Sequence, residues 1–427
     1  MAVAMAVAVG IGLVGCSSGG GGNSSAGGSS SPRTVNFVFY GNAAQAKGYD
    51  ALFNAFHKEN PEITVKAQAI AATSWSDFSN TVATRMAGGT SYDVIQVATE
   101  GQRLFASKGL LEPLDPYIAK DKAYVDAYFA DMNPNVLTWN QKYSSVDKNT
   151  YFIPGAYNTV GLYLNTDLFK KAGIPIPTNG WTWDEFKADG VKIKAATGAY
   201  LFPAGATGQF PDVSPWLMTN NANTFNADWN KATFDSPQAI EAATFVRSLV
   251  ADGLSPKPGG TFDAPTQLAK DALATFPGGR WPTQDIQRLK AVDKTVIVPF
   301  PTKVGSGSPV GWDAWPILKG SKNKADAWTL IKFLMSKEAN DIQASSPTVS
   351  AVPARISAAT SAAFTDNAPK GMQVLVDALS YATPIPGPDR GPESEKIILE
   401  AWLSAITGAS SPKDALTSAN EKLNALL

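Results

Sequence analysis

The apolar and polar positions near the start of the chain alternate between a strand-like and a helix-like pattern. Residues 34–41, 62–70 and 92–98 each read as a strand, the last of them as a buried one. Between them, 47–61 and 74–89 place apolar side chains three and four residues apart, as one face of an amphipathic helix does. This β-α-β-α-β order predicts an α/β fold with a doubly wound parallel sheet, in which ligands bind at the carboxyl ends of the strands.

Farther along the chain the same reasoning predicts a mixture of helices and strands. The predicted elements are helices near 235–252, 324–337 and 396–405, strands near 294–300 and 311–318, and a final helix that Ser411 caps and Pro412 begins. The roughly 395 residues that follow the first thirty-one are enough for two ordinary domains or one large α/β unit.

The first thirty-one residues have a different composition from the rest. Residues 1–15 are apolar and small, about the length of a signal-peptide core and too short to span a bilayer. Cys16, the only cysteine, follows Leu13-Val14-Gly15, and this stretch resembles the lipobox of bacterial lipoproteins. Residues 16–31 are rich in glycine and serine, as a flexible tether is. We therefore expect a signal peptide over 1–15 and lipidation of Cys16, although "MAVAMAVAVG" lacks the usual Lys or Arg; the alternative is an accidental cysteine.

Charge and residue counts exclude several classes of function. A formal net charge of −1, without a run of Lys or Arg, gives no electrostatic basis for binding nucleic acid. His57 is the only histidine, so zinc sites and His-based catalytic groups have too few partners. Neither a Walker-type phosphate loop nor a dinucleotide-binding fingerprint is present. Paired carboxylates remain available for acid–base chemistry.

Tryptophan is abundant, and several of the eleven tryptophans lie in turn-like stretches such as "TSWSD", "GWTWDEF", "FPGGRWP" and "VGWDAW". An indole offers a flat apolar face with an N–H at its edge, which suits a sugar ring with C–H faces and polar rims. Neighbouring Asp, Glu, Asn and Arg side chains would pair with the sugar hydroxyls. The alternative is that most of these tryptophans pack in the core.

Eight stretches, in this order, carry a family resemblance: "ALFNAFHKENPEITVK", "YDVIQVA", "LFASKGLLEPLDPYI", "GLYLNTDLFKKAGIPIPTNGWTWDEF", "ATFPGGRW", "VGWDAWPI", "AWTLIKFLMSKEAN" and "AVPARISAA". Together they resemble the extracellular solute-binding proteins (family 1) of bacterial carbohydrate ABC importers, the branch that includes maltose-binding protein. The resemblance implies a two-lobed periplasmic-binding-protein-like fold (type II) with the ligand cleft between the lobes. It implies a first lobe of 32–155 plus 300–350 and a second lobe of 156–299 plus 351–427.

The resemblance also assigns ligand-binding residues. Glu100 follows the third strand, where relatives often place a carboxylate that accepts sugar hydroxyls, and Tyr157 and Asn158 lie where the chain crosses between lobes. Trp281 matches a turn whose tryptophan stacks on a sugar, although Arg280 replaces the usual proline. The other expected ligand-binding residues are Tyr40, Asn42, Trp75, Trp216, Trp312, Asp313 and Arg355.

The resemblance predicts a non-catalytic lipoprotein that captures a sugar, an oligosaccharide or a sugar-like polyol by lobe closure and delivers it to the transmembrane subunits of an ABC permease. It implies a monomer on the outer face of the cytoplasmic membrane, attached by lipid alone, with no cofactor, no metal, no catalytic residue and no nucleic-acid partner. The alternatives are an exported glycoside hydrolase, which needs two carboxyl groups flanking the scissile bond, and an adhesin or structural lipoprotein.

Overall fold

The computed structural model describes residues 33–177, 180–260, 262–346, 350–366 and 368–427. The predicted signal peptide, Cys16 and the tether lie outside the described residues. The strands are β1 (Arg33–Tyr40), β2 (Ile63–Ile70), β3 (Val94–Ile95), β4 (Val97–Ala98), β5 (Ile153–Asn158), β6 (Gly161–Asn165), β7 (Thr275–Gly278), β8 (Thr295–Val298), β9 (Ser308–Trp315), β10 (Val352–Pro353) and β11 (Ala382–Pro384).

Helices are found throughout the chain. Those of its first half are α1 (Ala43–Gly48), α2 (Asp50–Glu59), α3 (Trp75–Ala87), α4 (Thr99–Ser107), α5 (Asp115–Lys120), α6 (Lys122–Ala130), α7 (Pro134–Tyr143), α8 (Thr166–Lys171), α9 (Trp183–Thr197), the π-helix η1 (Gln209–Val213) and α10 (Ser214–Met218). Those of its second half are α11 (Pro237–Ala251), α12 (Ala264–Ala269), α13 (Thr283–Arg288), α14 (Lys324–Met335), α15 (Lys337–Ser345), α16 (Ile356–Ala359), α17 (Ala362–Thr365), α18 (Gln373–Asp377), α19 (Gly391–Thr407) and α20 (Pro412–Asn424), with short 3-10 turns at η2 (Val292–Lys294) and η3 (Ala378–Ser380).

The first lobe is built around the parallel sheet β2-β1-β3, as the alternating pattern predicts. Val35, Phe37 and Phe39 of β1 are buried in this lobe's core. Helix α3 begins where predicted, because the Ser74 hydroxyl accepts a hydrogen bond from the backbone N–H of Asp77. The β-α-β-α-β prediction for the start of the chain is therefore confirmed.

The third predicted strand divides at Gln96 into β3 and β4, which belong to different sheets. β3 continues the parallel sheet beside β1, whereas β4 pairs antiparallel with β9. The Gln96 side chain donates a hydrogen bond to Asp313 and accepts one from the Tyr49 hydroxyl, each at 2.8 Å. These two hydrogen bonds lie at the point where the chain passes from the first sheet to the second.

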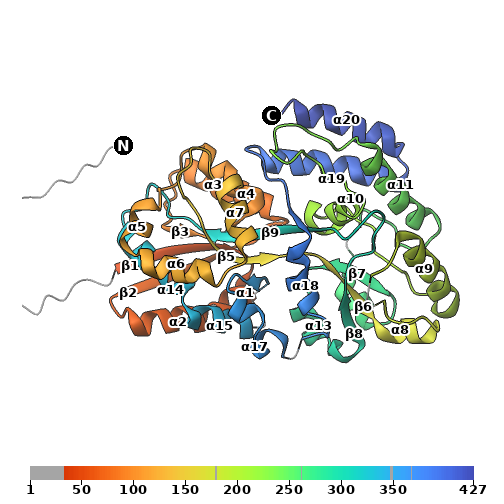
Figure 1. Cartoon of the computed structure of the whole chain (residues 1–427), viewed down its shortest axis with the longest axis horizontal. Coiled ribbons are helices and arrows are strands. Elements are labelled where there is room, and N and C mark those ends of the chain that lie inside the picture. Colours follow the sequence, from red (N-terminus) through yellow and green to blue (C-terminus); the bar gives the residue numbers. More distant parts are fainter. Residues whose placement is uncertain (1–32, 178–179, 261, 347–349, 367) are drawn as a thin grey trace, which may run out of the picture.

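A second sheet, in the order β10-β5-β9-β11 with β4 beside β9, joins the two halves of the molecule (Figure 1). β5 and β9 run antiparallel from one half to the other, with an irregularity between Pro154 and Ala156. β9 pairs with β4 of the first lobe near Asp313 and with β11 near Ser308 at its other end. Two strands that pass between the lobes are thus held side by side.

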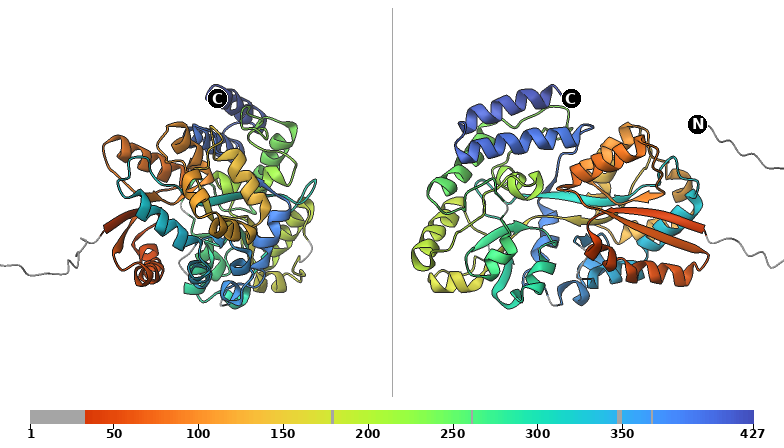
Figure 2. Two further views of the ribbon diagram at one scale, coloured as in Figure 1. Left: turned by 60° about the vertical axis from the view of Figure 1, so that its left-hand side comes forward. Right: turned by 180° about the vertical axis from the view of Figure 1, so that it is seen from behind.

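The second lobe contains the sheet β7-β6-β8, whose strand pairs are both antiparallel. The parallel arrangement predicted from the first hundred residues therefore does not extend to this sheet. Helices α11, α19 and α20 lie together on this lobe, and Figure 2 shows from behind that the C-terminal helices (blue) are at the opposite end from β1 and β2 (red). The chain has a two-lobed α/β fold.

Two segments near the expected lobe boundaries pack against the lobe to which they were not assigned. The backbone of Thr302 pairs with Trp181, and Lys303 N–H donates to Thr219 O, so the segment after β8 lies on the second lobe. By contrast, Arg355 forms an ion pair with Asp131 at 2.9 Å, and α16 and α17 pack against α15 of the first lobe. The lobe boundaries at 300 and 351 stay predictions. The packing described here indicates that the chain segments next to them contact the other lobe.

Candidate functional site

We call the region where the two lobes meet, beside β5 and β9, the junction. Its first-lobe side carries two aromatic rings at the carboxyl end of the parallel sheet. Tyr40 is the last residue of β1 and Trp75 the first of α3; their ring centroids lie 4.8 Å apart in an edge-on arrangement. Both side chains are half-buried. Burial, with Asp77 and Glu395 nearby, raises the pKa of the Tyr40 hydroxyl. These are two of the predicted ligand-binding residues, and the structure brings them together.

Glu395 of α19 connects the two lobes at this point. Its Oε2 accepts a hydrogen bond from the Ser74 hydroxyl at 3.1 Å, and its Oε1 accepts one from Gln209 N–H at 3.3 Å. Ser74 caps α3 in the first lobe, whereas Gln209 begins the π-helix η1 in the second. Sequence reasoning missed Glu395, because a glutamate in a helical stretch carries no local signal of such a role.

Glu100 lies near Glu395, and Asp313 lies near Glu100. Burial, with Glu395 and Asp313 adding to it, raises the pKa of Glu100 to about 8, and its Oε2 has no hydrogen-bond partner among the described residues. Burial raises the pKa of Asp313 to about 7, although the hydrogen bond from Gln96 opposes this shift. Glu100 and Asp313, both predicted for the site, therefore lie together, and near neutral pH each carboxyl group is partly protonated. A protonated carboxyl donates as well as accepts hydrogen bonds, as a sugar hydroxyl requires.

The second-lobe side of the junction also carries aromatic side chains. Trp281 and Phe210 are half-buried, with ring centroids 6.1 Å apart. A Cβ atom at Gly279 would lie 2.4 Å from the Trp281 ring and 2.6 Å from Asn158 Oδ1, so glycine allows these two groups to meet. Asn158 accepts a hydrogen bond from Arg280 N–H and donates one to Ser350 O. The predicted pair Trp281 and Asn158 is thus brought together.

The two sides are connected through Gly311 of β9. A Cβ atom there would lie 3.3 Å from the Phe210 ring, and Gly311 is the strand partner of Asn158. Asp313 follows two residues later on the same strand, and alternate residues of a strand share a face. The Phe210 ring, Asn158 and Asp313 therefore all lie beside the same stretch of β9.

Arg280 stabilises the turn that carries Trp281. Its guanidinium is buried and donates hydrogen bonds to the backbone oxygens of Gln343, Ala344, Ser346 and Ala351. It also lies 4.8 Å from the ring centroid of Phe364. Burial lowers its pKa to about 10, so it stays charged at neutral pH. Arg280 attaches this turn to the C-terminal end of α15 and to the segment that follows it.

The other predicted residues have different surroundings. Trp216 is fully buried among the rings of the second-lobe core, and Trp312 is fully buried, with its indole N–H donating to Asn140. Arg355 pairs with Asp131, and Tyr157 is only 3% exposed within β5. Asn42 is exposed and hydrogen-bonds with Gln45. Core packing covers the Trp216 and Trp312 rings in this conformation, and a role for either residue in ligand binding stays a prediction.

Among the described residues, no group of three or more His, Cys, Asp or Glu side chains is arranged to hold a metal ion. Within that same part of the chain, no helix has the length and hydrophobicity needed to cross a bilayer.

The chain is similar to bacterial binding proteins in sequence and in fold. The family model described as bacterial extracellular solute-binding protein matches residues 40–341. A binding protein of Brucella abortus is 27% identical over 306 residues, covering 68% of this chain and 69% of that protein. The multiple sugar-binding protein of Streptococcus mutans is 26% identical over 319 residues, covering 69% and 70%. The structure of an ABC substrate-binding protein of Listeria monocytogenes in complex with cycloalternan has a TM-score of 0.80 at 22% identity, covering 92% of this chain and 98% of that one.

Proposed function

The chain belongs to the bacterial extracellular solute-binding protein family, and from this premise we propose that it captures a sugar, an oligosaccharide or a sugar-like polyol and delivers it to the permease of an ABC importer. A multiple sugar-binding protein and a cycloalternan complex among its relatives support this ligand class. The ligand lies at the lobe junction, between the first-lobe pair Tyr40 and Trp75 and the second-lobe pair Phe210 and Trp281.

The observation that carries the proposal is that both lobes present half-buried aromatic rings on either side of a set of carboxylates. Aromatic faces pack against the C–H faces of a sugar ring, and carboxyl groups bind its hydroxyls. Glu100 contributes an oxygen that has no partner among the described residues. Trp281 and Trp75 cover the two ends of the ligand.

Closure of the lobes is the conformational step that the permease recognises. A ligand that touches both lobes binds the closed state more tightly than the open one, and only this difference in affinity shifts the population. β5 and β9 connect the lobes as adjacent strands, which suits a hinge between two rigid bodies. Glu395 hydrogen-bonds to both lobes and so lies where such a movement changes contacts.

We propose that the protein binds carbohydrate without cleaving it. Glycoside hydrolases use a carboxyl group with a raised pKa as general acid, and Glu100 and Asp313 both have raised pKa values. These two residues are therefore the ones that the alternative, a glycoside hydrolase, would use. Incubation of the protein with an oligosaccharide panel distinguishes the two: the proposal predicts intact sugar by chromatography, and cleaved product would contradict it.

We further propose that the mature protein is a monomer attached to the outer face of the cytoplasmic membrane through lipid on Cys16. The apolar segment before Cys16 and the Gly/Ser segment after it support this proposal. One acyl chain binds a bilayer weakly, whereas two or more anchor a protein stably. A Cys16→Ala variant should leave the membrane fraction; its retention there would contradict the proposal.

The experiment that tests the binding function is a titration of the purified protein with D-glucose, D-mannitol, maltose and a set of longer oligosaccharides. Binding raises the unfolding temperature, because a ligand stabilises the native state by RT ln(1 + [L]/Kd). A rise with at least one of these ligands is expected, and it should be absent with inorganic phosphate and amino acids. A protein that responds to amino acids but to no carbohydrate would contradict the proposed function.

A further inference from the structure

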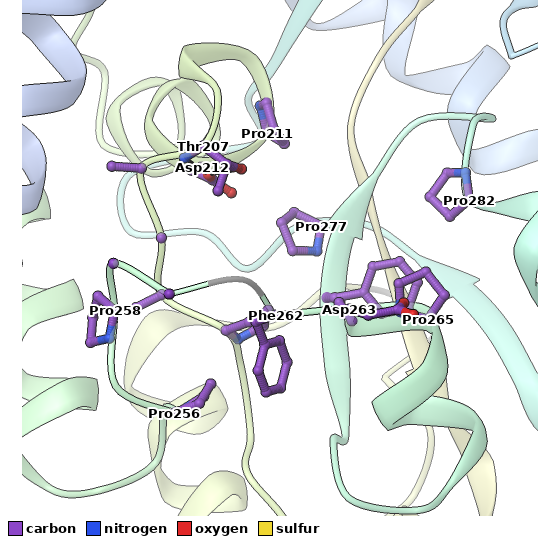
Figure 3. A pocket seen from close by; sticks show the side chains of 18 of the residues that line it. Thr207, Pro211, Asp212, Pro256, Pro258, Phe262, Asp263, Pro265, Pro277 and Pro282 are labelled. Carbon is purple, nitrogen blue, oxygen red and sulfur yellow. Dashed lines mark hydrogen bonds between the residues drawn. The ribbon is translucent and has the colours of Figure 1, made fainter. Parts of the chain in front are cut away.

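A cavity of about 530 Å³ lies in the second lobe, next to the junction (Figure 3). Its size falls within the roughly 300–1,000 Å³ of known small-molecule sites. The wall is unusually rich in proline rings: Pro203, Pro211, Pro256, Pro258, Pro265, Pro277 and Pro282. Proline rings are rigid, so they present apolar faces to a ligand without losing side-chain freedom when it binds. Phe262 adds an aromatic face on the side opposite Asp212.

Asp212 is a buried carboxylate in the wall of this cavity. Its side chain is only 8% exposed, and Oδ2 accepts hydrogen bonds from Thr207 N–H, the Thr207 hydroxyl and Gly208 N–H. In the part of the chain that the structure describes, no donor contacts Oδ1. The two other acidic side chains of the wall are engaged in local bonds, Asp263 with Thr266 and Asp285 with Arg288. Asp212 Oδ1 is therefore the buried acceptor that the wall leaves available.

The cavity and the junction are joined by a single turn of chain. The π-helix η1 begins with Gln209, which bonds to Glu395 at the junction, and continues with Phe210, whose ring approaches Gly311 and Trp281. The next two residues, Pro211 and Asp212, line the cavity. Trp281 itself also lines it. π-helices are rare and are often found at functional sites, and this one has one end in each region.

We infer that the cavity is an extension of the sugar site and that the ligand is an oligosaccharide, one end of which lies at the junction while its following unit enters the cavity. This inference rests on the proposed function. Trp281 contacts the unit at the boundary, the proline rings and Phe262 pack against the C–H faces of the unit inside, and Asp212 Oδ1 accepts a hydrogen bond from one of its hydroxyls. A monosaccharide or a linear polyol would leave the cavity filled with water.

Calorimetric titration with matched length series tests the inference. The probes are D-glucose, D-mannitol and the two- to six-unit members of the α-1,4-glucan, β-1,4-glucan and β-1,4-xylan series. We expect affinity in the series that binds to rise about tenfold or more on adding units beyond the first, the gain from one well-placed hydrogen bond together with apolar contact.

Two variants locate that gain. Gly260 lines the cavity, and a Cβ atom there meets no atom within 4 Å, so Gly260→Trp places a large side chain at the cavity without a steric clash at its base. Gly305, outside the cavity wall, is equally unobstructed, and Gly305→Trp is the matched control. Asp212→Asn keeps an oxygen for the Thr207 and Gly208 donors while replacing the other oxygen with an amide group.

Gly260→Trp and Asp212→Asn should each remove most of the length-dependent gain while leaving the affinity for the shortest ligand within about twofold of wild type. Gly305→Trp should change neither. Binding of short sugars with no gain for longer ones, or a gain that both variants retain, would overturn the inference and leave the proposed function standing. Failure to bind any sugar of any length would overturn both.

Discussion

Two groups of aromatic side chains in this protein have opposite structural settings. The core aromatics (Trp183, Phe202, Trp216, Phe245 and Phe300) pack around one another with centroid distances from Trp216 of 4.7 to 5.8 Å, and Trp216 is fully buried. The junction aromatics (Tyr40, Trp75, Phe210 and Trp281) are half-buried and meet in pairs, one pair on each lobe. A tryptophan beside a proline or glycine turn therefore contributes to stability among the core aromatics and to ligand recognition among the junction aromatics. The two roles are distinguished by how completely other protein atoms cover the indole ring.

The largest effect expected is at the centre of the core aromatics. Trp216→Ala should lower the free energy of unfolding by about 3–5 kcal/mol, because it removes a buried indole and leaves a cavity among rings that cannot close over it. Chemical denaturation monitored by circular dichroism measures this loss. A loss below about 1 kcal/mol would show that Trp216 is not a core residue, and the difference between the core aromatics and the junction aromatics would no longer hold.

Arg280 and Trp281 are adjacent in one turn, and we expect Arg280 to contribute to stability and Trp281 to ligand binding. Arg280→Met should cost about 2–3 kcal/mol of stability, since it removes charge-assisted hydrogen bonds and leaves buried carbonyl groups without a donor. Denaturation of Arg280→Met and Trp281→Ala side by side provides the comparison. Equal stability losses would mean that Trp281 is also a structural residue.

Trp281→Ala should weaken sugar binding by about 1–3 kcal/mol, the value of burying a large apolar side chain, while its stability changes by less than about 1 kcal/mol. Trp312→Ala is the contrasting variant, because the Trp312 indole is buried and donates to Asn140. Its main effect should be on stability. Wild-type affinity in Trp281→Ala, measured by calorimetry with the sugar found by titration, would place the ligand elsewhere.

The junction also differs from the core in carrying titratable groups. In the unfolded chain a glutamate loses its proton near pH 4.5, whereas folded Glu100 keeps it to about pH 8, so the native state binds more protons between these values. Stability should therefore fall as pH rises from about 5 to about 8. Thermal unfolding across that range should show the slope, and Glu100→Gln should reduce it, leaving the part that comes from Asp313. An unchanged slope in the variant would assign the effect to other groups.

The sequence predicts local elements well because their spacing reflects local backbone geometry. The repeat of apolar residues predicts β1, α3 and α20, and the caps Ser74 and Ser411 mark where the two helices begin. The division of the third strand into β3 and β4 is not visible in the pattern, because both pieces are buried and apolar. What separates them is the pairing of β4 with β9, some two hundred residues away.

The site is less accessible to sequence reasoning because its contacts are non-local. Glu395 lies 321 positions from Ser74 and 186 from Gln209, and no spacing rule relates them. The family resemblance led to Tyr40 and Trp75, to Glu100 and Asp313, and to Asn158 and Trp281, which lie near each other in these pairs. It also led to Trp216 and Trp312, whose rings are in the core. A motif places a residue on the correct strand or turn; only packing decides to which side its ring points.

The central claim is that a sugar held at the junction draws the two lobes together. Small-angle X-ray scattering of the protein with and without the sugar found by titration tests it most directly, with Trp281→Ala at the same sugar concentration as the control. Lobe closure predicts a smaller radius of gyration for the wild-type protein at saturating sugar and little change for the variant. An unchanged radius in the saturated wild-type protein would contradict lobe closure.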